Sequence, residues 1–128
     1  MTYLFVYGTL LSHFNNEVLK PIAALMQYEG QGKLKGRIFD LGAYPALTMS
    51  ETESAVVHGE VYKLASNKEV FAALDEYEGE EYRRELHSVQ LDGGKIIRCW
   101  VYIYQPEPDK NVIQIISGDY LAYIRNRG

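Results

Sequence analysis

Five stretches of the chain carry the hydrophobic pattern of β-strands. Tyr3–Tyr7 is a continuous apolar run, as expected of a strand that is covered on both faces. Four further stretches alternate or run apolar and are rich in β-forming residues: 32–42 (GKLKGRIFDLG), 54–64 (SAVVHGEVYKL), 82–91 (YRRELHSVQL) and 95–104 (KIIRCWVYIY). The last two are joined across Asp92-Gly93-Gly94, a sequence typical of a β-hairpin turn.

A helical pattern is clearest at residues 66–78. Ser66 and Glu69 have the spacing of a capping box, which predicts that Ser66 is the N-cap. Gly79 follows the last apolar position and provides a stop. We therefore expect one helix between these two signals.

The remaining pattern predicts an α+β fold. Residues 15–28 are expected to be mostly helical, divided by Pro21 into two short turns, and a C-terminal helix is expected over about 118–127. The Tyr44-Pro45 pair biases Tyr44 toward an extended conformation. Strands and helices do not alternate regularly, which favours a mixed or antiparallel, barrel-like sheet over a doubly wound fold. Without repeats or linkers, residues 1–128 are expected to form a single domain.

Composition and charge narrow the function classes. A net charge of -4 without any Lys/Arg cluster argues against nucleic acid as a partner. No apolar run approaches the ~18 residues that span a membrane, and the first residues lack the basic region of a signal peptide. Cys99 is the only cysteine, so the chain fits a reducing, cytoplasmic compartment. The 11 tyrosines suit cleft linings as well as ordinary strands.

One carboxylate of the predicted helix is expected to face the core. Phe71, Leu74 and Glu78 lie at i, i+3 and i+7 and share one stripe, whereas Glu69, Asp75 and Glu76 point elsewhere. Desolvation at the end of an apolar stripe raises the pKa of a carboxyl group and makes it a candidate general base or acid. The structural alternative is that Glu78 turns outward, or pairs with Arg83 or Arg84.

The end of the first strand is a second candidate. In Tyr7-Gly8-Thr9-Leu10, the glycine allows a ligand to approach the backbone closely, and free N–H groups there could hold an oxyanion. A simple structural turn is the alternative. The sequence lacks the second glycine and the Gly-Lys-Ser/Thr of a phosphate-binding loop.

The sequence predicts neither a metal site nor an enzyme nucleophile. His13, His58 and His87 are scattered, without the spacing of metal ligands. Cys99 lies within a strand pattern, where a buried and inert thiol is expected. We therefore expect no metal ion at the site.

Five motifs together resemble one known family. In order they are VYGTL (6–10), LGAYPAL (41–47), HGEVYKL (58–64), LDEYEG (74–79) and YRR (82–84). They resemble the γ-glutamylcyclotransferase-like superfamily, which includes γ-glutamylamine cyclotransferases and plant avirulence-induced-gene proteins. The resemblance covers about residues 3–104. It implies a small mixed β-barrel flanked by short helices.

The resemblance also implies a set of site residues. Glu78 matches the family's catalytic glutamate, and the backbone of Tyr7, Gly8, Thr9 and Leu10 matches its substrate-binding loop. Two further pairs of residues match cavity residues of the family. Tyr44 and Pro45 match a pair at the cavity mouth, and Tyr82 and Arg84 match a Tyr-x-Arg that follows the glutamate. Ala46 stands where many members have glycine.

The implied activity is the cyclisation of a γ-glutamyl amine or amide with a free α-amino group to 5-oxoproline and a free amine. Glu78 would act as general acid and base. No metal or organic cofactor would be needed, because the nucleophile belongs to the substrate. The partner would be a small γ-glutamyl compound, and the protein would be a monomer or weak dimer. The absence of long insertions favours the compact branch of the family over the glutathione-specific one. Two alternatives stay open: a non-catalytic ligand-binding or regulatory member, and a cyclotransferase that deprotects an intermediate of one pathway.

Overall fold

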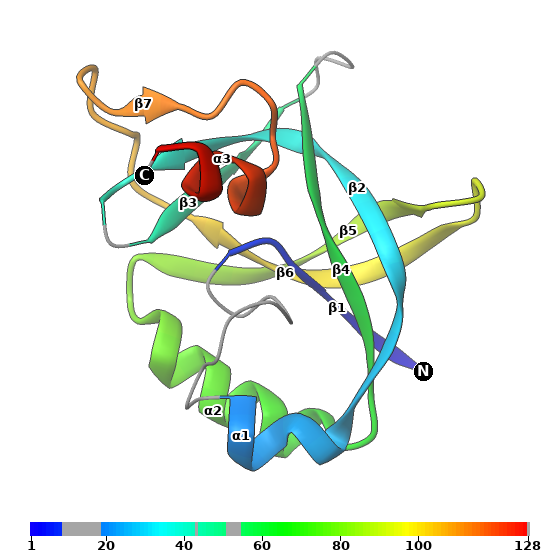
Figure 1. Cartoon of the computed structure of the whole chain (residues 1–128). Coiled ribbons are helices and arrows are strands. Elements are labelled where there is room, and N and C mark those ends of the chain that lie inside the picture. Colours follow the sequence, from blue (N-terminus) through cyan, green and yellow to red (C-terminus); the bar gives the residue numbers. More distant parts are fainter. Residues whose placement is uncertain (9–18, 43, 51–54, 128) are drawn as a thin grey trace.

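A computed structural model describes residues 1–8, 19–42, 44–50 and 55–127 (Figure 1). Its strands are β1 (Thr2–Val6), β2 (Met26–Asp40), β3 (Pro45–Met49), β4 (Val56–Leu64), β5 (Tyr82–Leu91), β6 (Ile96–Tyr104) and β7 (Ile113–Gln114). Its helices are α1 (Leu19–Ile22), the 3-10 helix η1 (Ala23–Leu25), α2 (Asn67–Glu78) and α3 (Tyr120–Arg127). Within the described residues, no helix is both long enough and apolar enough to cross a membrane.

The strands form a closed mixed barrel. Hydrogen-bonded neighbours follow the order β2-β4-β1-β6-β5, and β5 pairs with β2 again to close the ring. β1 and β6 are parallel, while the other neighbours around the ring are antiparallel. β3 and β7 pair with the far end of β2 and extend the sheet beyond the ring. The expected α+β class and barrel-like sheet are therefore confirmed.

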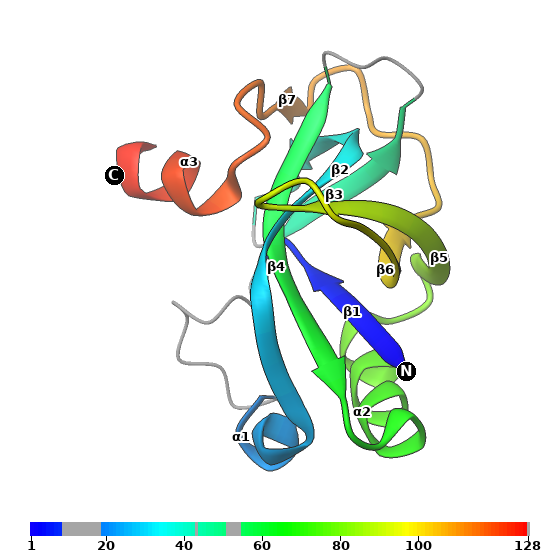
Figure 2. The same ribbon diagram turned by 90° about the vertical axis from the view of Figure 1, so that its right-hand side faces the viewer.

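β1 separates two apolar clusters, which explains its continuous hydrophobic run. Phe5 and Tyr7 point into the barrel interior, where they join residues such as Val61 and Val101. The intervening Leu4 and Val6 point to the other face and pack beneath α2, with Leu74. Figures 1 and 2 show α1 and α2 together at one end of the molecule, whereas α3 lies beside β7. The expected coverage of both faces is confirmed.

The predicted hairpin has the expected position. β5 and β6 are antiparallel, and their register pairs Gln90 with Ile96 across the turn and Arg84 with Tyr102 further along. Gly93 and Gly94 both have positive φ, a conformation that glycine adopts without steric cost.

Two details of the helices differ from the sequence predictions. The expected helix over 15–28 is wrong at its C-terminal end, because β2 begins at Met26 and pairs along Met26–Tyr28 with β4. These long-range ladder hydrogen bonds override the local helical pattern; residues 15–18 lie outside the described part. Ser66 is the N-cap of α2, but its side chain makes no capping hydrogen bond, so the expected capping box is not formed.

Candidate active site

α2 carries one carboxylate to the edge of the core. Val70, Phe71 and Leu74 are buried under the helix, and Glu76 is exposed. Glu78 ends the helix on the buried side and is only partly exposed. The chain then leaves at Gly79, whose φ of 83° and ψ of -174° suit glycine almost exclusively. The predicted stripe thus places Glu78 where the helix meets the end of β1.

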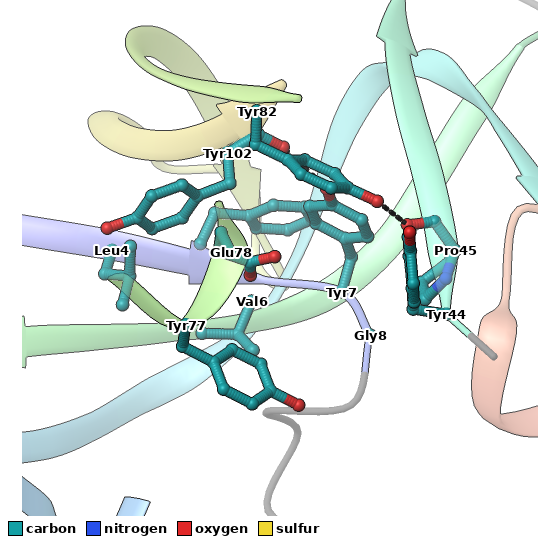
Figure 3. Close-up of a pocket in the computed structure, with 11 residues that line it drawn as sticks. Leu4, Val6, Tyr7, Gly8, Tyr44, Pro45, Tyr77, Glu78, Tyr82 and Tyr102 are labelled. Carbon is teal, nitrogen blue, oxygen red and sulfur yellow. Dashed lines mark hydrogen bonds between the residues drawn. The ribbon is translucent and has the colours of Figure 1, made fainter. Parts of the chain in front are cut away.

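Glu78 faces a cavity of about 340 Å³ (Figure 3). This volume lies within the range of small-molecule sites. The cavity is built from β1, the start of β3, the end of α2 and the facing strands β5 and β6. Its described lining residues are Leu4, Phe5, Val6, Tyr7, Gly8, Tyr44, Pro45, Tyr77, Glu78, Tyr82 and Tyr102.

Burial raises the pKa of the Glu78 carboxyl to about 7, and no cation among the described residues offsets this effect. A group with this pKa can both accept and donate a proton near neutral pH. The alternative in which Glu78 pairs with Arg84 does not occur, because the Arg84 guanidinium binds Asp75 instead. Glu78 is the only carboxylate among the described lining residues.

Tyr7 fixes the end of β1 at the cavity. Its buried hydroxyl donates a hydrogen bond to the backbone carbonyl of Tyr102 over 2.5 Å. Burial, followed by the nearby Glu78 and Tyr82, holds the pKa of Tyr7 well above its usual value. Tyr7 is therefore a neutral wall residue rather than a proton acceptor.

Gly8 lies against Pro45 at the cavity wall. A Cβ atom at Gly8 would lie 2.7 Å from Pro45 Cγ, closer than real Cβ contacts allow. Gly8 does not have positive φ, so close packing rather than backbone conformation requires glycine here. Thr9 and Leu10, the other two residues of the expected backbone cradle, lie outside the described residues.

Tyr82 connects the β5 wall of the cavity to Tyr44 and Pro45 at the cavity mouth. Its hydroxyl donates a 2.8 Å hydrogen bond to the carbonyl of Pro45, and its ring meets the Tyr44 ring edge-on at 6.2 Å. Burial, with a smaller contribution from Glu78, raises the pKa of Tyr82 above its usual value. Tyr44 is 41% exposed and borders the opening.

The family model described as gamma-glutamyl cyclotransferase, AIG2-like, matches residues 4–122. The chain belongs to this family. The resemblance inferred from the five motifs is therefore confirmed.

Relatives in this cyclotransferase family match over nearly the whole length of this chain. A Methanocaldococcus jannaschii protein with the provisional name gamma-glutamylcyclotransferase MJ1514 is 35% identical over 126 residues, covering 96% of this chain and 98% of its own. The gamma-glutamylcyclotransferase family protein YtfP of Escherichia coli K12 is 32% identical over 121 residues, covering 92% and 95%. The crystal structure of YkqA from Bacillus subtilis superposes with a TM-score of 0.76 at 27% identity, over 99% of this chain and 43% of YkqA.

Six of the residues expected at the site of this cyclotransferase family member come together in the cavity: Tyr7, Gly8, Tyr44, Pro45, Glu78 and Tyr82. Arg84 does not. Its side chain extends from β5 to α2, where it binds Asp75 and its guanidinium carbon lies 3.9 Å from the centre of the Phe71 ring. We therefore do not carry Arg84 forward as a substrate-binding residue.

Sequence reasoning missed Tyr77 and Tyr102 as cavity residues of this family member. Tyr102 could have been found by counting the hairpin register back from Asp92-Gly93-Gly94, which places it opposite Arg84. Tyr77 adjoins Glu78, but no local signal separates a cavity-lining tyrosine from an exposed one. Cys99 is fully buried in the barrel cluster, and burial raises the pKa of its thiol to about 12.

Proposed function

We propose that this protein cyclises a γ-glutamyl amine or amide with a free α-amino group, releasing 5-oxoproline and an amine. One observation carries the proposal. A carboxyl group whose pKa is raised to about 7 faces the Tyr7-Gly8 end of β1 across a cavity of small-molecule size. Membership of the AIG2-like gamma-glutamyl cyclotransferase family agrees with this chemistry.

The tyrosines of the cavity support Glu78 as the reacting group. The hydroxyls of Tyr7, Tyr82 and Tyr102 each donate a hydrogen bond to another protein group. Burial raises the pKa of all three phenols. They are therefore suited to shape the cavity rather than to take up a proton, which leaves the Glu78 carboxylate for that role.

The reaction begins with a proton transfer. The ionised Glu78 takes a proton from the α-ammonium group of the substrate, which makes the α-amine nucleophilic. The amine lone pair then attacks the γ-carbonyl carbon and forms the C–N bond of a five-membered ring. Because nucleophile and carbonyl belong to one molecule, holding them in a bent conformation supplies much of the rate.

The second half of the reaction expels the amine. The γ-carbonyl oxygen carries negative charge in the tetrahedral intermediate, and backbone N–H groups of the loop that begins at Tyr7 would stabilise it. Such a donor contributes roughly 3–4 kcal/mol in comparable sites. As the bond between the γ-carbon and the leaving nitrogen breaks, protonated Glu78 gives its proton to the departing amine. The ring nitrogen still carries one surplus proton, which the regenerated Glu78 carboxylate takes up and releases to solvent. The products are 5-oxoproline and the free amine, and no cofactor takes part in these steps.

A panel of γ-glutamyl compounds with different amines tests the proposal, with 5-oxoproline measured by chromatography. We expect at least one member to be converted, and its α-N-acetylated analogue to remain intact because its nitrogen is no longer nucleophilic. Hydrolysis of the acetylated compound at a similar rate would indicate an amidase instead. Binding of panel members without turnover would favour the non-catalytic alternative.

A further inference from the structure

Three hydrogen-bonded side chains connect α2 to the β5–β6 hairpin, one helical turn before Glu78. Asp75 precedes Glu78 by three residues, so the two lie one helical turn apart on neighbouring faces of α2. Arg84 donates from Nε to Oδ1 and from Nη2 to Oδ2 of Asp75, both at 3.1 Å. Tyr102 donates from its hydroxyl to the same Oδ1 at 2.6 Å.

The two donors are placed by the register of the hairpin. Arg84 on β5 and Tyr102 on β6 are directly paired in the antiparallel ladder, so both side chains reach the same carboxylate. The Arg84 guanidinium also lies over the Phe71 ring, on the preceding turn of α2. The Arg84 side chain therefore contacts two successive turns of α2.

Tyr102 connects this network to the cavity. Its ring lines the cavity beside Glu78 (Figure 3), and its backbone carbonyl accepts the hydrogen bond of Tyr7 at the end of β1. Side chain and backbone of this one residue thus join α2, β6 and β1. These contacts link the helix that carries Glu78 to the Tyr7-Gly8 backbone.

We propose that Asp75, Arg84 and Tyr102 form a positioning clamp that fixes the carboxylate of Glu78 relative to the Tyr7-Gly8 end of β1. None of the three is a catalytic residue; they act through the placement of Glu78. The inference rests on the proposed function, because the clamp matters for catalysis only if Glu78 is the acid and base.

Exposure and charge agree with a role in positioning rather than in stability. The Asp75 side chain is 47% exposed, and ion pairs at such sites contribute little to folding. Burial would raise the pKa of Asp75, but the hydrogen bonds from Arg84 and Tyr102 outweigh it and lower the pKa. Among the described residues, the titratable groups that line the cavity with Glu78 are the phenols of Tyr7, Tyr44, Tyr77, Tyr82 and Tyr102.

Two variants loosen the clamp without emptying the cavity. Tyr102→Phe removes only the hydroxyl and keeps the ring and the backbone carbonyl. Asp75→Asn keeps the shape but loses the charge that Arg84 binds. Tyr104→Phe is the matched control. Tyr104 is also on β6, and its hydroxyl donates a hydrogen bond to the Glu81 carboxylate, which is not part of α2.

The first measurement is the turnover of L-γ-glutamyl-p-nitroanilide, or of the best panel substrate if the anilide is poor. For both clamp variants we expect kcat to fall roughly ten- to hundredfold, the size of a misplacement near 1 Å, with KM little changed. The midpoint of the kcat/KM profile should move to lower pH, because a loosened helix end admits water to Glu78. Tyr104→Phe should match the wild type.

The second measurement does not need activity. NMR titration of the Glu78 carboxyl carbon in ¹³C-glutamate-labelled protein should show a lower midpoint in Tyr102→Phe and Asp75→Asn than in wild type. If the clamp variants behave like Tyr104→Phe in this titration, the inference is wrong. A wild-type protein that forms no 5-oxoproline would instead refute the proposed function, and the titration would still decide whether the clamp holds Glu78.

Discussion

At the scale of single residues, two carboxyl groups on α2 have pKa values shifted in opposite directions. Asp75 accepts hydrogen bonds from Arg84 and Tyr102 that outweigh its partial burial, and its pKa is lowered. Glu78, one turn later, is desolvated without such partners among the described residues, and its pKa rises to about 7. Divergent environments of this kind are how proteins divide structural and acid–base roles between like groups.

Glu78→Gln should remove activity while leaving the fold intact. The amide keeps the size of the side chain but cannot accept the substrate proton, so we expect turnover to fall by at least ~10²–10⁴-fold. Stability should stay equal or rise, since a desolvated ionisable group is lost without leaving a cavity. 5-Oxoproline release and urea unfolding measure the two effects.

Glu76→Gln is the matched control for this substitution. Glu76 is exposed and points about 200° away from Glu78 on the helix. Its replacement should leave activity unchanged and the unfolding free energy within about 0.5 kcal/mol of wild type. An inactive Glu76→Gln beside an active Glu78→Gln would overturn the assignment of the base.

Stability and activity should respond to pH in opposite ways through Glu78. Between pH 4.5 and about 7 the folded state keeps the Glu78 proton that the unfolded state has released, so stability falls as the pH rises. The full shift corresponds to at most about 3 kcal/mol. Over the same range kcat/KM should rise as the base ionises. Urea unfolding of wild type and Glu78→Gln across this range tests the prediction, and equal slopes for the two proteins would contradict it.

At the scale of elements, the two ends of α2 are held by different means. The N-terminal Ser66 has extended φ and ψ but no side-chain capping bond, and the C-terminal Gly79 adopts a conformation that other residues avoid. The end that carries Glu78 is therefore the one fixed by backbone geometry and by the clamp. The N-terminal end is held by the packing of Val70 and Phe71 and by a 2.7 Å hydrogen bond from the Asn67 side chain to the Thr2 hydroxyl.

Substitutions at the two ends of α2 should separate these contributions. Gly79→Ala places a side chain in a backbone region that costs about 1–3 kcal/mol, so the unfolding free energy should fall by that amount. Ser66→Ala should cost less than the ~1 kcal/mol of a typical N-cap, because no capping bond is lost. Urea denaturation measures both, and a larger loss in Ser66→Ala than in Gly79→Ala would show that the helix is anchored at its N-terminus.

At the scale of the whole molecule, closure of the barrel requires a close approach between β1 and β4. Gly59 on β4 lies where a Cβ would meet the Val6 carbonyl oxygen and would lie 2.7 Å from Phe5 Cζ. This contact lets Phe5 fill the barrel while Val6 faces α2. The same strand therefore completes the barrel and delivers Tyr7 to the cavity.

Gly59→Ala should destabilise the whole molecule. Overpacking against backbone and a buried ring typically costs about 1–3 kcal/mol, and the midpoint of thermal unfolding should fall accordingly. His58→Ala, an exposed neighbour on β4, should change the unfolding free energy by no more than about 0.5 kcal/mol. Equal unfolding free energies for the two variants would show that β1 and β4 can separate enough to accept a side chain at Gly59 without loss of stability.

The sequence by itself determined the features that depend on short-range periodicity. The 3.6-residue period identified α2 and selected Glu78 as the inward carboxylate, and Asp92-Gly93-Gly94 located the hairpin. The continuous apolar run of β1 indicated a strand covered on both faces. Five motifs were enough to identify the family.

The tertiary structure decided what depends on contacts between distant segments. The ladder with β4 makes Met26–Tyr28 a strand, because hydrogen bonds to residues far along the chain outweigh a local helical pattern. Strand alternation puts Tyr82 and Arg84 on one face of β5, but the docking of α2 decides that Tyr82 reaches the cavity while Arg84 stops at Asp75. Only this docking buries Glu78, and so only the folded chain gives its carboxyl a pKa of about 7.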